Sequence, residues 1–149
     1  MVSTRAGYAG GTKKNPTYHD LGDQTETIQV EFDPSLITYQ DLLPVFWEGH
    51  DATIARSRQY RSLILFHSQE QQELALASRE REESRVGKAI VTEIAALSEF
   101  TPAEGYHQKY WLRQMPELMN ELRSAFASEE EMTASTAAAR LNGLLGGYG

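Results

Sequence analysis

Cysteine is absent from this chain of 149 residues. Its absence excludes disulfides, zinc sites built on thiolates and every cysteine nucleophile. The four histidines are widely spaced, and none pairs with another at the H-x-x-x-H spacing that places two metal ligands on one face of a helix. They are His19, His50, His67 and His107. The sequence therefore predicts no metal site.

Long apolar runs and an excess of positive charge are lacking as well. No stretch approaches the roughly 20 apolar residues of a membrane span, and the start of the chain has no signal-peptide pattern. The net charge of −7 and the pI near 5.1 argue against a general nucleic-acid binder. With 40% hydrophobic and 23% charged residues, the composition is that of an ordinary globular domain. We therefore predict a cytoplasmic protein with no nucleic-acid and no membrane partner.

Hydrophobic periodicity predicts strands and helices in alternation. Strands are expected over residues 27–32, 63–66 and 89–94, and helices from Thr38 to about Gly49, over 68–85 and over 103–114. Thr38 and Asp41 have the spacing of a helix-capping pair, whereas Pro44 should distort the second turn of the same helix. This order of elements predicts an α/β fold, an α+β two-layer sandwich or roll in which a mixed sheet is flanked by helices.

The end of the chain has a different character and predicts an added C-terminal helical tail. Leu118, Leu122 and Ala125 repeat at helical spacing, and Ser128 with Glu131 forms a capping box for a second helix. We therefore expect a domain over residues 1–115 and a helical extension over 116–149. The apolar stripe of this tail needs a surface to cover, and its own domain is preferred to a partner protein.

Glu26 is an unusual polar residue at the entrance of the first predicted strand. In the segment TETIQVEF over residues 25–32, Ile28, Val30 and Phe32 alternate with polar residues, and Glu26 shares their parity. A carboxyl group facing the core should have a raised pKa, because burial disfavours its charged form. Two interpretations stay open at this point: a structural glutamate at the entrance of a strand, or a protonated general acid.

Six short motifs together resemble one known family. They are TRAGYAGG (4–11), NPTY (15–18), GDQTE (22–26), FWEGHD (46–51), QYRS (59–62) and AEGYHQKY (103–110). In this order, over roughly residues 2–113, they resemble the A-type peptide methionine-S-sulfoxide reductases. That family reduces the S epimer of methionine sulfoxide, free or in proteins, and so reverses one step of methionine oxidation.

The resemblance implies roles for five residues of this chain. In the family, a glutamic acid protonates the sulfoxide oxygen and two tyrosines bind it; by motif these are Glu26, Tyr18 and Tyr60. Tyr106 and Tyr110 resemble aromatic residues near the substrate pocket. The family implies no bound cofactor, methionine sulfoxide as substrate, and thioredoxin or another thiol as reductant.

The resemblance also reveals a missing part. In the family, a cysteine or selenocysteine in a G-C-F-W-G motif attacks the sulfoxide sulfur, and this chain contains neither the motif nor any cysteine. We therefore expect the chain as given to be inactive. The connection between Asp51 and Tyr60 is short, as in members that use selenocysteine. This predicts a reading frame that was cut at an in-frame UGA codon, with Met1 an internal methionine. The alternative is a non-catalytic module that binds methionine sulfoxide or another protein.

Overall fold

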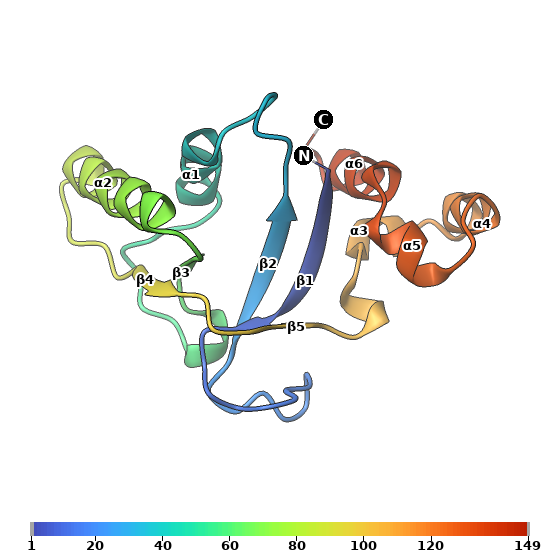
Figure 1. Cartoon of the computed structure of the whole chain (residues 1–149), viewed down its shortest axis with the longest axis horizontal. Helices are drawn as coiled ribbons and strands as arrows, with labels where there is room; N and C mark the ends of the chain where they lie inside the picture. The colour runs from blue at the N-terminus through green and yellow to red at the C-terminus, as the bar shows by residue number, and fades with distance from the viewer. Residues whose placement is uncertain (1, 149) are drawn as a thin grey trace. The chain divides into compact units, whose positions relative to one another are not determined.

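Two small sheets organise the computed structural model, which describes residues 2–148. Strands β1 (Ser3–Ala9), β2 (Thr25–Glu31) and β5 (Phe100–Pro102) form one sheet in the order β2–β1–β5 (Figure 1). Strands β3 (Leu63–Phe66) and β4 (Glu93–Ala96) form a parallel pair in which Leu63 lies opposite Glu93. Helix α2 (Gln69–Val86) joins β3 to β4, as a parallel pair requires a crossover connection. The predicted α/β class is confirmed.

The chain divides into two compact units. The sheet-and-tail unit comprises Met1–Gly7, Thr27–Asp33 and Pro102–Gly149, and the βαβ unit comprises Tyr8–Glu26 and Pro34–Thr101. The predicted extension 116–149 falls within the sheet-and-tail unit. The domain boundary expected at residue 116 stays a prediction.

Helix α1 (Tyr39–Glu48) begins at the capping pair read from the sequence. The Thr38 hydroxyl accepts a hydrogen bond from the Asp41 N–H (3.2 Å), and the Asp41 carboxylate accepts one from the Thr38 N–H (2.9 Å). Pro44 lies inside the helix, which nevertheless continues to Glu48. In the core of the βαβ unit, Trp47 is buried and its indole N–H donates to Ser78 of α2 (2.6 Å). These contacts fix α1 against α2.

The end of the chain forms more and shorter helices than predicted. The expected helix over 103–114 is a 3₁₀ turn, η2 (Gly105–His107), followed by one turn of α-helix, α3 (Tyr110–Arg113). Three helices follow instead of two, namely α4 (Pro116–Ser124), α5 (Glu129–Ala134) and α6 (Thr136–Leu145) (Figure 1). Ser135 ends α5 with extended backbone and caps α6, so it divides the stretch that was expected to be one helix.

The helical tail packs on its own chain. Leu112 of α3, Met119 of α4, Met132 of α5 and Ala138 of α6 form one buried cluster. Helices of four to ten residues have little stability of their own, so this shared cluster is what holds them. Leu118 and Leu122 of the predicted apolar stripe pack against this cluster, whereas Ala125 is exposed.

Further elements differ from the prediction, and strand β5 has no counterpart in it. Strand β4 begins at Glu93 rather than at Ala89, because the Val91 N–H donates to the Ala52 carbonyl (2.9 Å) and the chain reaches β3 only beyond that point. The connection between α1 and β3 ends in a 3₁₀ turn, η1 (Arg58–Tyr60). Among the described residues, no helix combines the length and the apolar character that a membrane crossing requires.

Candidate functional site

Glu26 lies at the entrance of β2 and is exposed, so the prediction that it faces the core was wrong. Ile28, which has the same parity, is 67% exposed, whereas Thr25 is buried. At this end of the strand, a hydrogen bond decides which side chain faces inward, because the Thr25 hydroxyl donates to the Arg58 carbonyl (3.0 Å). The carboxyl of Glu26 therefore lacks the burial on which the general-acid argument from the strand pattern depended.

Turn η1 is held against the residues that lead into β2. The Arg58 side chain donates to the Asp23 carbonyl (3.0 Å), and the Arg61 Nε donates to the Thr25 hydroxyl oxygen (2.8 Å). The hydroxyl of Thr25 thus donates to Arg58 and accepts from Arg61, one contact before Tyr60 and one after it. Side-chain contacts, rather than strand pairing, bring these two segments together.

This contact places Tyr60 beside Glu26. The pKa of the Tyr60 phenol is raised, chiefly by the negative charge of Glu26, then by partial desolvation and by the neighbouring Tyr18. The Gln59 side chain donates to Glu26 Oε1 at 2.6 Å. Three residues assigned by motif, Glu26, Tyr18 and Tyr60, are therefore brought together in the βαβ unit, and we call them the Glu26 cluster.

Tyr18 reaches the cluster from a tight turn. Thr17 and Asp20 form an isolated antiparallel bridge with backbone hydrogen bonds of 3.2 and 3.1 Å. Tyr18 and His19 occupy the two central positions of this turn, with their rings edge to face and their centroids 5.3 Å apart. Both side chains are exposed. The Tyr18 side chain therefore lies at the surface and not in the core.

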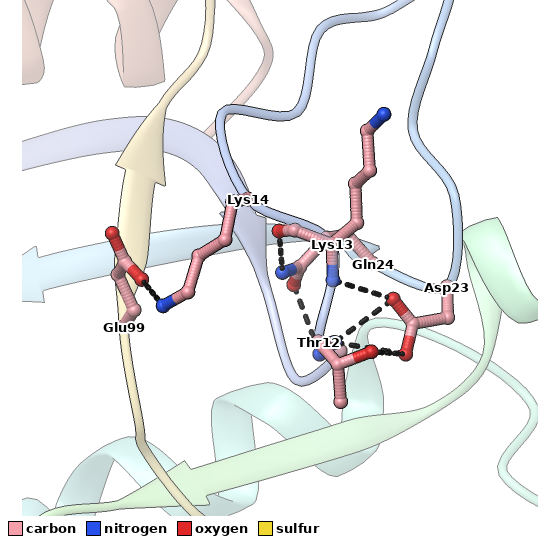
Figure 2. A network of polar contacts seen from close by, with 7 residues as sticks. Thr12, Lys13, Lys14, Asp23, Gln24 and Glu99 are labelled. Carbon is pink, nitrogen blue, oxygen red and sulfur yellow. Dashed lines mark hydrogen bonds and ion pairs between the residues drawn. The ribbon is translucent and has the colours of Figure 1, made fainter.

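A polar network holds the loop that leads to this turn (Figure 2). The Asp23 carboxylate accepts hydrogen bonds from the N–H groups of Thr12 (2.8 Å) and Lys13 (2.9 Å). These backbone donors lower the pKa of Asp23 to about 2. The Gln24 side chain accepts from the Gly11 N–H (2.9 Å) and donates to the Lys13 carbonyl (2.8 Å). Two consecutive side chains just before Glu26 thus fix the loop over residues 11–13.

Arg61 connects three segments of the βαβ unit. Its guanidinium donates to the Gly10 carbonyl (2.7 Å) and to the Thr25 hydroxyl (2.8 Å), and it forms an ion pair with Glu93 of β4. Gly10 has a φ of +81°, and a Cβ at this position would lie 2.7 Å from a methyl group of Leu63. The tight turn at Gly10 therefore needs glycine, and Arg61 fixes it next to the Glu26 cluster.

Tyr106 and Tyr110 belong to the sheet-and-tail unit. Both are exposed; Tyr106 lies against His107 with ring centroids 4.2 Å apart, and Tyr110 lies edge to face with Trp111 at 5.3 Å. Their assignment as substrate-binding residues stays a prediction.

Lys109, in the same unit, is a buried cation that sequence reasoning missed. It has a left-handed backbone conformation (φ 52°), and its ammonium donates to the Thr4 carbonyl and hydroxyl oxygens at 2.5 and 2.8 Å. Burial, and secondarily the charge of Arg5, lowers its pKa to about 8. Lys109 lies within the motif AEGYHQKY, which was the available signal, whereas its burial and its contact with Thr4 are revealed only by the fold.

Gln59, Arg61 and Asp23 are among the polar residues of the site that sequence reasoning left without a role. Gln59 and Arg61 lie within the motif QYRS and Asp23 within GDQTE, which was the available signal. Within the part of the chain that the structure describes, no group of three histidine, cysteine or acidic side chains could hold a metal ion.

Comparison with known proteins identifies one family. The family model for peptide methionine sulfoxide reductase matches residues 1–140. The peptide methionine sulfoxide reductase of Drosophila melanogaster is 42% identical over 152 residues, which cover 100% of this chain and 61% of the relative. Peptide methionine sulfoxide reductase A5 of Arabidopsis thaliana is 45% identical over 96% of this chain and 58% of its own length. The chain thus spans about three-fifths of these two relatives.

Two solved structures agree with the sequence relatives. The reduced form of Mxr1 from Saccharomyces cerevisiae superposes with a TM-score of 0.70 at 29% identity, over 76% of this chain and 71% of that one. Methionine sulfoxide reductase A of Corynebacterium diphtheriae gives a TM-score of 0.64 at 31% identity, over 76% of this chain and 63% of that one. Because the family model covers nearly the whole chain, and because sequence and fold lead to the same relatives, this chain belongs to the peptide methionine sulfoxide reductase family.

Proposed function

We propose that this chain forms the sulfoxide-recognising part of a methionine-S-sulfoxide reductase that repairs oxidised methionine. The observation that carries the proposal is the convergence of Glu26, Tyr18 and Tyr60, with Gln59 donating to the Glu26 carboxyl at 2.6 Å. A sulfoxide oxygen carries a partial negative charge and accepts hydrogen bonds. The two phenols can supply two donors to such an oxygen, and the carboxyl group of Glu26 supplies a third only when it carries a proton.

The Glu26 cluster supports recognition of the sulfoxide oxygen. Its protonation by Glu26 is carried over from the family resemblance, and the cluster offers no group for the attack on sulfur. Reduction by thiol chemistry needs a thiolate or selenolate nucleophile, and none of the 149 residues is a cysteine. In this proposal the nucleophile comes from outside these residues, and a thioredoxin-like thiol regenerates it. The substrate is methionine sulfoxide, free or in a protein, and a cytoplasmic location stays a prediction.

Titration with N-acetyl-methionine-S-sulfoxide, followed by NMR on the amides around residues 18, 26 and 60, tests this recognition. We expect weak, saturable binding that Glu26→Met weakens about tenfold, since the loss of one hydrogen-bond donor costs about 1.4 kcal/mol. Glu70→Met, which replaces an exposed acid of α2, is the matched control and should bind as wild type does. Equal affinity of wild type and Glu26→Met would contradict the proposal.

Turnover is the complementary measurement. We expect no reduction of methionine-S-sulfoxide by the 149-residue chain with dithiothreitol or thioredoxin, because the chain offers no thiol or selenol. Measurable reduction by the purified chain would show that the reaction proceeds by other chemistry.

A further inference from the structure

Gln59 contacts two members of the Glu26 cluster, namely Glu26 and Tyr60. Its side-chain amide donates to Glu26 Oε1 at 2.6 Å, and its hydrogen bond to Tyr60 lowers the pKa of that phenol, against the rise caused by Glu26. The Gln59 side chain is half-buried, whereas Glu26 and Tyr60 are exposed. One amide therefore contacts both the acid and one of the phenols.

The backbone on either side of Gln59 is fixed independently of this contact. The Arg58 carbonyl accepts from the Thr25 hydroxyl at 3.0 Å, and the Arg61 Nε donates to the same hydroxyl at 2.8 Å. Arg58 also donates to the Asp23 carbonyl at 3.0 Å. Gln59 thus reaches Glu26 from an anchored turn.

The amide contact has a chemical consequence for a neutral Glu26. A carboxylic acid has one carbonyl oxygen, which accepts hydrogen bonds, and one hydroxyl, which donates. An N–H that donates to Oε1 requires a lone pair there, so it favours Oε1 as the carbonyl oxygen. The acidic proton is then carried by Oε2. The Gln59 amide therefore selects which oxygen of the acid can donate to a bound ligand.

We propose that Gln59 is a positioning residue that holds Glu26 by Oε1, so that the Oε2 hydroxyl donates its hydrogen bond to the sulfoxide oxygen. The inference rests on the proposed function and adds to it the residue that orients the acid. Gln59 acts through Glu26 and Tyr60, and nothing in this role requires it to contact the substrate itself.

The test compares Gln59→Met with Gln69→Met in the full chain. Methionine keeps the length of glutamine and removes the amide. Gln69 is the matched control, because on α2 it donates to Glu73 Oε1 at 2.9 Å, the same kind of amide-to-carboxyl contact away from the cluster. The dissociation constant for N-acetyl-methionine-S-sulfoxide is measured by NMR on folded protein. The Tyr60 titration is followed in the same samples through ring-labelled tyrosine.

We expect Gln59→Met to weaken sulfoxide binding five- to tenfold and to move the Tyr60 titration to higher pH, because the bond that lowers its pKa is lost. Gln69→Met should change neither quantity. A residue that only stabilised the fold would alter the unfolding temperature without altering affinity in the folded chain. Wild-type affinity in Gln59→Met would overturn this inference and leave the proposed function intact. Absence of binding by the wild-type chain would overturn the proposed function, and this inference with it.

Discussion

Replacing Arg61 by methionine should destabilise the βαβ unit more than any surface substitution. The Arg61 side chain is only 10% exposed and donates to the Gly10 carbonyl, the Thr25 hydroxyl and the Glu93 carboxylate. Methionine fills similar space but donates to none of them. Two partly buried acceptors, on Gly10 and Thr25, then lose their donor.

The size of the effect follows from these three contacts. Each hydrogen bond from the guanidinium to a partly buried oxygen contributes about 1–1.5 kcal/mol net. The ion pair adds less, on the order of 0.5 kcal/mol, because the Glu93 side chain is 53% exposed and solvent screens its charge. The expected loss in the free energy of unfolding is therefore about 3 kcal/mol. For a chain of this size that corresponds to a fall in Tm of roughly 6–12 °C.

Urea unfolding followed by circular dichroism measures this loss. Arg81→Met, at an exposed position of α2, is the control and should lie within about 0.5 kcal/mol of wild type. Arg61→Lys should be intermediate, because a lysine keeps the charge but not the planar fork that reaches several acceptors. A double-mutant cycle with Thr25→Val should give a coupling of about 1 kcal/mol. If Arg61→Met unfolded at the same urea concentration as Arg81→Met, the three contacts of Arg61 would contribute nothing to stability.

Two further substitutions test the loop and the buried lysine. Gly11→Ala would place a Cβ 2.5 Å from the Asp23 carbonyl oxygen, so we expect a loss of about 1–3 kcal/mol in the free energy of unfolding by urea. The control Gly105→Ala places a Cβ that meets no heavy atom within 4 Å and should be neutral. Equal urea midpoints for the two variants would contradict this expectation. Lys109 has a pKa of about 8 in the folded chain, against an ordinary value of 10.5. As the pH rises from 8 to 10.5, the free energy of unfolding of wild type should therefore increase relative to that of Lys109→Met, by at most about 3 kcal/mol. Over that range the unfolded chain holds a proton that the folded chain has released; a difference that did not change with pH would refute the depressed pKa.

Local signals in the sequence predicted the elements that depend on local contacts. The capping pair Thr38–Asp41 placed the start of α1, and the apolar run over Leu63–Phe66 gave β3 with its observed bounds. The strand predicted over 89–94 is observed later, as β4, because the Val91 N–H donates to the Ala52 carbonyl before the chain reaches β3. Which backbone partner a strand takes is decided by residues far away in the sequence, and periodicity carries no information about it.

The candidate site was likewise predicted in part. The motifs gave Glu26, Tyr18 and Tyr60, and the structure brings these three side chains together. The strand pattern, in contrast, assigned Glu26 to the wrong face, since Thr25 is drawn inward by polar partners 33 and 36 residues away. Alternation of apolar residues reports burial only where burial is driven by apolar packing. At this strand end it is driven by hydrogen bonds.

The methionines of the tail give the family's chemistry a bearing on this chain's own stability. Met119 and Met132 are 3% and 0% exposed inside the tail cluster, whereas Met115 is 48% exposed. An oxidant therefore reaches the thioether of Met115 first, at a position where a polar sulfoxide stays in contact with water. A sulfoxide on Met132 would instead introduce a strong dipole among Leu112, Ala138 and their neighbours, where no water can solvate it. Oxidative damage to this chain thus has an order: a surface lesion that the fold tolerates, and then a lesion in the cluster that separates the tail helices.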